Sequence, residues 1–324
     1  MRHSTWTAIE SSPVALRLYR SYRRLPASVR APLRWFSMPR WYLALAYIRR
    51  VADGRVVSGP FAGMRLELSP VSSRHLLGYV LGTQELELRD AVESIVRRGY
   101  ATIINIGAAD GYYAIGLARR LPSAEVVGFE ALTEHHAPLR RAARANGVAA
   151  RFRLEGFCDP AGLRRELESA RPPALVIADI EGGERELLDP RKVSALCRVD
   201  LLVETHDALA PGCTDLLIER FAATHAIVRI RGCPRTLGDF PSAALPLLRR
   251  LMPGTALELM NERRKGAQEW LLLRSKEPPS PIYPQNRTAR WNPRPSEPHT
   301  RSEEHAPIRC PGRHPVWRRG HPLA

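Results

Sequence analysis

A glycine loop between two short apolar runs constrains the fold of this chain more than any other feature. The β-branched run at 103–106 leads into a loop that carries Gly107 and Gly111, and a pattern with the period of a helix follows it. The second apolar run, at 126–129, is closed by Glu130. A strand, a glycine loop, a helix and a strand that ends in an acid form half of a nucleotide-binding α/β unit.

The spacing of the glycines excludes two common phosphate-binding loops. A dinucleotide-binding G-x-G-x-x-G loop that starts at Gly107 would need glycines where the chain has Ala109 and Tyr112. A P-loop would need Gly-Lys-Ser or Gly-Lys-Thr, which does not follow. What remains is Asn105-x-Gly107-x-x-x-Gly111, and the alternative interpretation is a glycine turn in an α/β protein of another function.

Short apolar runs alternate with helical patterns as far as residue 273. The predicted strands lie at about 101–106, 125–130, 150–155, 174–179, 199–204, 225–231 and 269–273. The predicted helices lie at about 111–121, 134–146, 160–170, 183–197, 212–223 and 241–251. This alternation predicts an α/β fold with a Rossmann-like, seven-stranded, mostly parallel sheet that is covered on both faces. The last strand lacks the usual crossover spacing, so we expect it to be antiparallel and at the edge of the sheet.

Changes in composition divide the chain into four predicted parts. These are a basic helical extension at 1–50, a lead-in at 51–100, the α/β domain at 101–276 and a disordered Pro- and Arg-rich tail at 277–324. The lead-in is predicted to hold a hairpin at 55–68. A helix should follow from Thr83, its expected N-cap, to about Arg98.

The net charge of +16 is concentrated outside the α/β domain. Residues 1–50 contain ten arginines and a single acidic residue, Glu10. Two aromatic clusters beside these arginines could lie on an anionic membrane surface, and the arginines could contact phosphates of nucleic acid. We favour the alternative that this segment ends in a helix packed on the main domain.

Polar side chains follow five of the predicted strands, at their carboxyl ends. They are Asn105, Glu130, 155–157, 179–184 and 204–207. Ligands of parallel α/β sheets bind at this rim, and buried carboxylates are costly unless they are used or paired. We therefore expect the set as a whole to be functional, whereas Asp159 and Asp207 are individual candidates for helix N-caps.

The rim carries segments that resemble a known family. Asn105-x-Gly107-x-x-x-Gly111 is similar to the first motif of class I S-adenosylmethionine-dependent methyltransferases, which has an acid in place of Asn105. The segments 179–188 and 201–207 resemble the D-x-E-G-x-E…L-L and E-x-H segments of FkbM-type methyltransferases. Segments at 82–88 and from 260 onward are similar to parts of some relatives, so the resemblance covers about residues 55–275.

The resemblance implies the class I methyltransferase fold and S-adenosylmethionine as the methyl donor. Glu130 would accept hydrogen bonds from both ribose hydroxyls of this donor. The donor-binding residues that it implies are Asn105, Gly107, Ala108, Asp110, Gly111, Tyr112, Glu130, Ala131, Gly156, Phe157 and Asp179. Asn105 keeps an acceptor oxygen without the charge of the family's acid, and Asp110 is expected to compensate in part for the loop asparagine that Ala109 replaces.

Methyl transfer to an oxygen atom needs a base. The candidates are Asp179, Glu181 and His206, and the ordinary pKa of histidine suits a base near neutrality. His206 could instead bond only a neighbouring backbone group. A divalent metal held by these three residues and Asp207, as in catechol-type O-methyltransferases, is the alternative that we do not favour, so we predict no metal ligands.

The residues after the fourth predicted strand argue against nucleic acid as the methyl acceptor. Base N-methyltransferases carry an Asn/Asp-Pro-Pro-aromatic motif there, and residues 179–182 contain no proline; the Pro-Cys pair of cytosine-C5 enzymes is also missing from the sequence. The resemblance implies a hydroxyl group of a small molecule or a glycan as acceptor. The alternatives are a catalytically weak donor-binding homologue that acts as an interaction protein, and nucleic-acid or membrane-surface binding through residues 1–50.

Cysteine usage and the N-terminal segment suggest a compartment. The five cysteines are scattered, contain no C-x-x-C pair and indicate reduced thiols. The first thirty residues lack the apolar core of a signal peptide. We therefore expect a cytoplasmic protein, and the sequence leaves its oligomeric state open.

Overall fold

The chain forms two compact units. A computed structural model describes residues 39–67, 76–262 and 269–277, together with residues 12–14, 17, 21, 24 and 26. Unit 1 comprises the described residues before 95 together with 232–262, and unit 2 comprises 95–231 together with 269–277. Residues 232–262 thus cluster with the N-terminal segments, whereas the sequence analysis placed them in the α/β domain.

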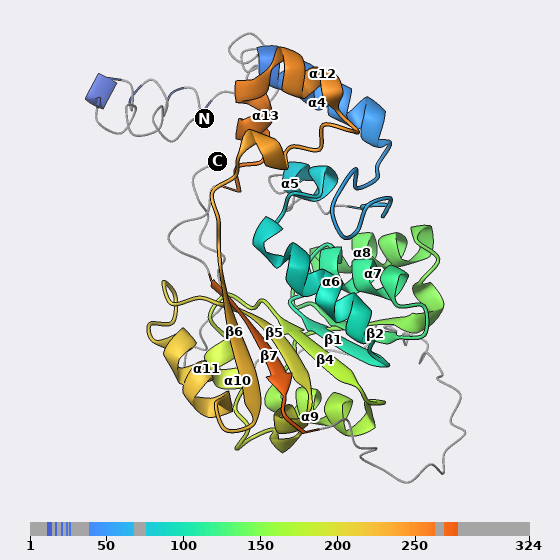
Figure 1. The fold of residues 1–324 in the computed structure, drawn as a ribbon, viewed down its shortest axis with the longest axis vertical. Helices are drawn as coiled ribbons and strands as arrows, with labels where there is room; N and C mark the ends of the chain where they lie inside the picture. The colour runs from blue at the N-terminus through green and yellow to red at the C-terminus, as the bar shows by residue number, and fades with distance from the viewer. Residues whose placement is uncertain are drawn as a thin grey trace, which may run out of the picture. The chain divides into compact units, whose positions relative to one another are not determined.

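Unit 2 is built on a seven-stranded sheet with the order β3-β2-β1-β4-β5-β7-β6 (Figure 1). Neighbours from β3 to β5 are parallel, and β7 is antiparallel to both β5 and β6. The strands are β1 (Thr102–Ile106), β2 (Glu125–Phe129), β3 (Phe152–Glu155), β4 (Ala174–Ala178), β5 (Asp200–Thr205), β6 (His225–Arg231) and β7 (Glu269–Ser275). The seven predicted strands and the antiparallel last strand are confirmed. The expected place of that strand is wrong, because β7 lies between β5 and β6 and leaves β6 at the edge.

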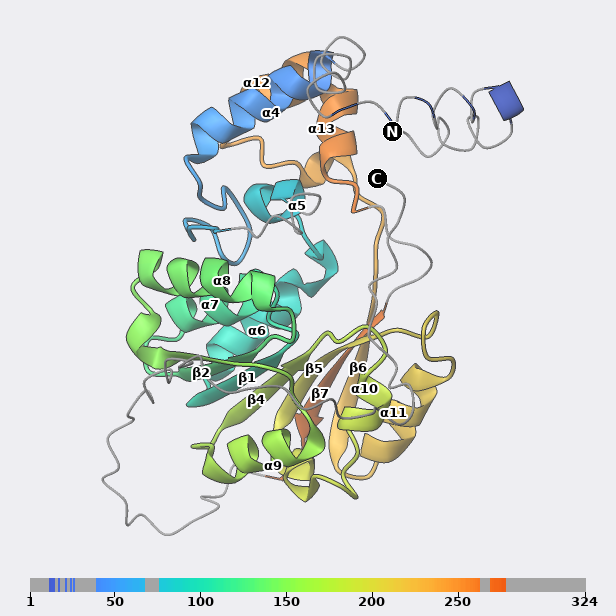
Figure 2. The ribbon, with the colours of Figure 1, turned by 180° about the vertical axis from the view of Figure 1, so that it is seen from behind.

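Helices cover both faces of this sheet, as predicted. Two of them, α7 (Tyr112–Arg120) and α8 (Thr133–Ala145), lie on one face. The opposite face carries α9 (Pro160–Ser169), α10 (Glu184–Leu187) and α11 (Cys213–Phe221) (Figure 2). Short 3-10 turns at Ala149–Arg151 and Ser194–Arg198 complete the connections.

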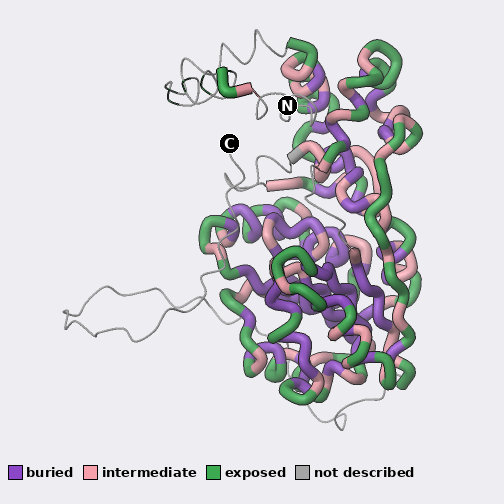
Figure 3. The backbone as a smooth tube through the Cα atoms, turned by 90° about the vertical axis from the view of Figure 1, so that its left-hand side faces the viewer, coloured by how far each residue is buried: buried purple, intermediate pink, exposed green. Residues whose placement is uncertain are grey.

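The central strands β1 and β4 are buried because their sequences are mostly apolar on both faces. Every residue of β1 and β4 is buried, and Figure 3 shows buried residues gathered in the interior of unit 2. Ile104 and Val176 belong to a cluster that also contains Leu163 of α9 and Leu217 of α11. Since side chains alternate along a strand, Asn105 points to the other face of the sheet, the one that α7 and α8 cover.

The register of the strands aligns their carboxyl ends. Ile106 at the end of β1 pairs with Phe129 of β2 and with Ala178 of β4, and Ala178 pairs with Val203 of β5. The polar residues that follow these strands therefore start at one level of the sheet. This alignment is what the predicted polar rim requires.

The predicted helix at 183–197 is wrong over most of its length. α10 ends at Leu187, and the chain then runs through a turn to the 3-10 helix at Ser194–Arg198. Pro190 cannot donate a backbone hydrogen bond inside a helix. The buried carboxylate of Asp189 instead accepts hydrogen bonds from the backbone N–H and the guanidinium of Arg191. The proline and this local bonding end the helix early.

Unit 1 is a small helical assembly around its own core. Ala44 and Ile48 of α4 share a buried cluster with Leu81, Leu248 and Leu259. Its helices are α4 (Pro39–Ala52), α5 (Leu76–Leu81), α12 (Pro246–Leu251) and α13 (Pro253–Leu259), with 3-10 turns at Leu86–Leu88 and Leu237–Asp239 and the start of α6 (Arg89–Arg98). The helix that ends the basic extension is thus packed, and its partners include residues of the 232–262 segment. The predicted helix at 241–251 begins only at Pro246.

Of two predictions about the lead-in segment, one is confirmed in a shorter form and the other is wrong. The expected hairpin at 55–68 contains an antiparallel bridge between Arg55 and Arg65, and further backbone hydrogen bonds join residues 54–56 to residues 63–66. Thr83 is not an N-cap, because α6 begins at Arg89 after a 3-10 turn. Glu85 starts that turn with a left-handed backbone, at a φ of 48°.

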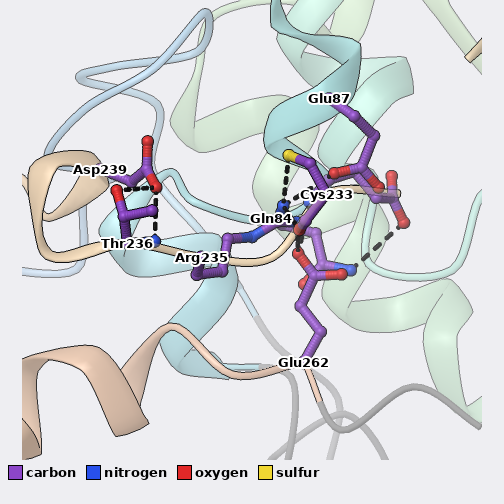
Figure 4. Close-up of polar contacts among 8 residues, drawn as sticks. Gln84, Glu87, Cys233, Arg235, Thr236, Asp239 and Glu262 are labelled. Atoms are coloured by element: carbon purple, nitrogen blue, oxygen red, sulfur yellow. Dashed lines mark hydrogen bonds and ion pairs between the residues drawn. The ribbon is translucent and has the colours of Figure 1, made fainter. Parts of the chain in front are cut away.

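A buried arginine connects the two halves of unit 1 (Figure 4). The Arg235 guanidinium donates a 2.9 Å hydrogen bond to Glu87 and a second hydrogen bond to Glu262. Its side chain is 9% exposed, and those of the two carboxylates are 3% and 8% exposed. Glu262 also accepts from the backbone N–H of Glu85, at 2.7 Å. The segments at 82–88 and 260–262, which the sequence analysis singled out, are therefore connected through one cluster of charged side chains.

Other predictions fall outside the described ranges. They are the tail from 278 onward and the basic extension up to residue 38, apart from isolated residues. In the part of the chain that the structure describes, no helix has both the length and the apolar character that crossing a membrane would require.

Candidate functional site

The glycine loop after β1 is fixed by the neighbouring strands. The backbone N–H groups of Gly107 and Ala108 both donate to the Phe129 carbonyl at 2.9 Å. Gly107 has a φ of 79°, and a Cβ there would lie 1.9 Å from the Asp179 carbonyl oxygen. Only glycine fits both conditions. The loop therefore lies against the ends of β2 and β4.

Gly111 fixes the other end of the loop. It precedes α7 with a φ of 81°, and a Cβ would lie 2.4 Å from Leu139 Cδ1 and 2.8 Å from Ile115 Cγ1. Ala109 also has a left-handed backbone, at a φ of 46°. A left-handed non-glycine residue is costly and is found where the surrounding structure determines it. The loop shape is thus set by tight packing from both sides.

Glu130 is held at the end of β2 beside this loop. Its Oε2 accepts a hydrogen bond from the Ala109 N–H at 2.7 Å, and its Oε1 accepts one from the Leu132 N–H at 2.8 Å. The side chain is buried. Each carboxylate oxygen has a second lone pair. Glu130 is therefore oriented and can still accept two further hydrogen bonds, as the two hydroxyls of a ribose require.

Asp110 does not face the same way. Its Oδ1 accepts from Nδ1 of His135 in α8 at 3.2 Å, and both side chains are almost completely buried. We expected Asp110 to take over part of the donor-binding role of the missing loop asparagine. Its carboxylate instead pairs with His135 of α8. Asn105 is 3% exposed on β1, and Tyr112 is buried at the start of α7.

The residues after β3 lie next to Glu130. The Glu130 N–H donates to the Glu155 carbonyl at 3.1 Å, which brings the two strand ends together. Phe157 is 67% exposed, which is unusual for so large an apolar side chain. A Cβ at Gly156 would meet no atom within 4 Å. Ala131, Gly156 and Phe157 are exposed and thus form an open edge of the rim beside the buried Glu130 carboxylate.

Asp179, Glu181 and His206 come together at the ends of β4 and β5. His206 Nε2 lies 3.6 Å from Asp179 Oδ1 and 3.9 Å from Glu181 Oε2. His206 is almost completely buried, whereas the side chains of Asp179 and Glu181 are 34% and 42% exposed. One ligand atom from each residue lies within 4.8 Å of the others. The three residues that the sequence analysis selected for the chemistry are therefore one group.

Two carboxylates of this group were not among the predicted site residues. Glu184 is completely buried, and its Oε1 accepts hydrogen bonds from the Ile180 N–H and from His206 Nδ1, both at 2.9 Å. Glu204 Oε2 lies 3.8 Å from His206 Nε2. Both residues occur in the two FkbM-like segments, which is the signal that could have identified them.

The carboxylates change the acid–base character of His206. Burial lowers the pKa of the imidazole, but the hydrogen bond to Glu184 and the charges of Asp179 and Glu181 outweigh it, so the pKa of His206 is raised. The protonated imidazolium is thus favoured more than in a free histidine. The role of His206 as a base stays a prediction, and the pKa of its ring lies above the ordinary value of histidine on which that prediction relied.

Asp207 lies outside the group. Its carboxylate accepts hydrogen bonds from the Thr214 backbone N–H and hydroxyl at the start of α11. Asp159 N-caps α9 and accepts from the Gly162 N–H at 2.6 Å. The helix-capping interpretation is therefore confirmed for Asp159, and Asp207 contributes to the helix start and not to the cluster.

The strand order of the sheet and the residues at its rim identify the fold class of unit 2. The order β3-β2-β1-β4-β5-β7-β6 with an antiparallel β7 is the sheet of class I methyltransferases, as the sequence resemblance implies. Within that sheet the glycine loop, Glu130 and the Asp179–Glu181–His206 group lie at the carboxyl ends of β1, β2, β4 and β5. The chain therefore has the class I methyltransferase fold.

Comparisons with known proteins find similarity to methyltransferases. No family model matches the chain. A release factor glutamine methyltransferase from Geobacter sulfurreducens is 29% identical over 144 residues, which are 39% of this chain and 51% of that protein. The match thus spans about half the length of this relative.

Solved methyltransferase structures are also similar. An O-methyltransferase from Bacillus cereus in complex with SAH is 14% identical, with a TM-score of 0.39; the match covers 64% of this chain and 82% of that one. A precorrin-6y C5,15-methyltransferase from Geobacter metallireducens is 13% identical, with a TM-score of 0.36; the match covers 58% of this chain and 87% of that one.

Proposed function

We propose that this protein is an S-adenosylmethionine-dependent methyltransferase of the FkbM type, which methylates a hydroxyl group of a small molecule or a glycan. The observation that carries the proposal is the hydrogen bond between Glu184 and His206. It joins the two FkbM-like segments, the first of which begins at Asp179, whose backbone carbonyl lies against Gly107 of the glycine loop. The similarity to a curated methyltransferase supports the broader class.

Residues on the open edge fit the methyl donor. Glu130 has two free lone pairs for ribose hydroxyls, and the exposed ring of Phe157 offers an apolar face for the adenine. The loop from Gly107 to Tyr112 would hold the amino-acid part, with Asn105 and Asp179 as acceptors for its ammonium group. Ala108 keeps the loop small, and Ala131 follows Glu130 on the same edge.

The chemistry needs little from the protein beyond alignment and proton removal. The bound donor supplies a methyl group that is already activated on a sulfonium. The acceptor hydroxyl loses its proton, its oxygen lone pair forms the new bond to the methyl carbon, and the electrons of the broken S–CH3 bond stay on sulfur. Asp179 and Glu181 are partly exposed and can receive the proton, whereas His206 is oriented by Glu184.

Calorimetric titration of the full chain with S-adenosylmethionine tests donor binding. We expect saturable binding in the wild type, no binding in Gly107→Arg and weaker binding in Phe157→Ala. Phe157 is exposed, so its loss should not unfold the chain, and Val228→Ala, another exposed apolar residue on β6, is the matched control. A wild type that binds no donor at millimolar concentration would refute the proposal.

The acceptor is identified by a transfer assay with labelled donor on cell extract, separated into small molecules, glycans and nucleic acids. Label in the small-molecule or glycan fraction supports the proposed acceptor class. Label in the nucleic-acid fraction alone would contradict it. Asp179→Ala should lose turnover while the chain still folds, because the Asp179 side chain is partly exposed.

A further inference from the structure

We propose that Asp179, Glu181 and His206 form a binding site for a divalent first-row metal cation, which the sequence analysis did not expect. Their ligand atoms lie within 4.8 Å of one another. The set offers one imidazole nitrogen and two carboxylate oxygens, which suits ions such as Mn²⁺. The buried Glu204 carboxylate, 3.8 Å from His206 Nε2, is a further oxygen donor at the same place.

The tautomer of His206 directs a lone pair into this group. Glu184 Oε1 accepts the hydrogen of His206 Nδ1, so in the neutral ring Nε2 carries no hydrogen. A histidine that donates one ring N–H to a buried carboxylate and binds metal through the other nitrogen is the usual arrangement in metalloproteins. Glu184 is completely buried, and in the described part of the chain its Oε2 has no hydrogen-bond partner.

The distances fit a shared cation better than hydrogen bonds. Nε2 lies 3.6 Å, 3.8 Å and 3.9 Å from oxygens of Asp179, Glu204 and Glu181, and each of these separations is too long for a hydrogen bond. Two ligands that are each about 2.1 Å from one cation are separated by about 3.0–3.7 Å at angles of about 90–120°. The separations from Nε2 are thus within or just beyond the range for coordination, and the ligand atoms of the three residues, which lie within 4.8 Å of one another, would have to draw together around one ion.

The exposure of the ligands suggests what such an ion would do. His206 closes the buried side, while Asp179 and Glu181 leave a partly open side that water or an acceptor oxygen can reach. If the proposed methyl transfer holds, Asp179 and Glu181 would act as metal ligands instead of as proton acceptors. The bound cation would lower the pKa of the acceptor hydroxyl, so that its proton leaves to solvent before the oxygen attacks the methyl carbon. This role rests on the proposed function, but the site itself does not.

Titration with Mn²⁺ alone tests the site. The full, untagged chain is stripped with a chelator and titrated by calorimetry, with the electron paramagnetic resonance signal of free Mn²⁺ as a second readout. We expect one ion per chain. Asp179→Asn and Glu181→Gln should each weaken binding by about tenfold or more. Glu186→Gln, an exposed neighbour on α10 that pairs with Lys192, is the matched control and should bind as the wild type does.

Spectroscopy separates a ligand from a supporting residue. Pulsed electron paramagnetic resonance of bound Mn²⁺ should show a hyperfine coupling to an imidazole nitrogen in the wild type. The coupling should be lost in His206→Gln and kept in Glu184→Gln, which should bind about 10–100-fold more weakly because the ring loses its carboxylate partner. Persistence of the nitrogen coupling in His206→Gln would overturn the assignment.

Two further outcomes decide the proposal. Failure of the wild type to bind Mn²⁺ at millimolar concentration refutes the site, and so does equal affinity in wild type, Asp179→Asn and Glu181→Gln. A parallel titration with S-adenosylhomocysteine keeps the two proposals apart. A wild type that binds S-adenosylhomocysteine but not Mn²⁺ refutes only the metal site. A wild type that binds Mn²⁺ but not S-adenosylhomocysteine refutes only the donor site.

Discussion

Oε1 of Glu184 accepts hydrogen bonds from the Ile180 backbone and from the His206 ring. It therefore fixes the turn after β4 and the ring at the end of β5 with one atom. Glu181, within that turn, has a φ of 54°, a conformation that non-glycine residues rarely adopt. Such a residue persists only where its surroundings determine it, which is common at functional sites. The same small region therefore combines backbone strain, complete burial and the proposed chemistry.

Gly107→Ala tests the packing of the glycine loop. Gly107 and Gly147 both have positive φ, but a Cβ at Gly147 meets no atom within 4 Å, whereas one at Gly107 would lie 1.9 Å from the Asp179 carbonyl. Gly147→Ala should cost only the left-handed strain, about 1–2 kcal/mol. We expect a distinctly larger loss of unfolding free energy for Gly107→Ala in urea titrations. Equal losses would show that the loop can move away from β4.

His225 should make the stability depend on pH. The ring is buried between the Val199 carbonyl and the Thr224 hydroxyl, both at 2.8 Å. Burial is the main cause that lowers its pKa, with Lys276 acting in the same direction and the Val199 carbonyl and Asp200 opposing. The neutral ring is thus favoured in the folded state, and its contribution is complete above the ordinary pKa of about 6.5. Stability should fall as the pH is lowered through that value toward the folded pKa.

Urea titrations between pH 8 and pH 5 measure this dependence. The decline below about pH 6.5 should be smaller in His225→Asn, which has no titrating ring. An unchanged decline in the variant would assign the effect to other groups.

At the scale of elements, the strands were predictable and several connections were not. Residues 103–106 and 174–178 are short runs of mostly apolar residues that include β-branched isoleucine or valine, and this pattern can be read locally. The break after Leu187 depends on how the Asp189 carboxylate bonds Arg191, two residues further along the chain. The Glu184–His206 pair joins residues 22 positions apart, and no local pattern reveals such a contact.

Substitution of Arg235 tests how much its buried ion pairs stabilise unit 1. Its removal leaves Glu87 and Glu262 buried without this cation. Arg235→Met should reduce the unfolding free energy by about 3–5 kcal/mol, as expected when one partner of a buried ion pair is lost. The exposed Arg249→Ala on α12 is the control and should cost less than about 1 kcal/mol.

A second substitution checks the cause. Glu262→Gln in the Arg235→Met background should recover part of the loss, because it removes a buried charge. Strictly additive losses would mean that Arg235 stabilises the unit by packing of its side chain alone.

At the scale of the whole molecule, the rim is assembled from segments that are far apart in the chain. Donor residues follow β1, β2 and β3, while the proposed chemistry follows β4 and β5. The sequence indicated this rim because parallel strands align their carboxyl ends, which is a property of topology. The sequence did not indicate which of the polar side chains at the rim point toward the site and which bond the neighbouring helices. Asp110 bonds α8 and Asp207 bonds α11, although both were candidates for the site.

Ligand binding should stabilise the molecule as a whole. If S-adenosylhomocysteine binds only the folded chain, a concentration 100 times its Kd adds about 2.7 kcal/mol to the unfolding free energy. Thermal unfolding of the wild type should shift upward with ligand concentration. A Phe157→Ala variant should need a higher concentration for the same shift, and an identical curve in the variant would remove Phe157 from the donor site.

The position of β7 has a consequence for how the sheet is made during synthesis. β6 leaves the ribosome before β7, yet its hydrogen-bonded neighbour in the finished sheet is β7. The nascent chain must therefore keep a place open beside β5 until residues 269–275 have emerged. A chain that stops before this point would expose the unpaired edges of both strands, which are templates for aggregation.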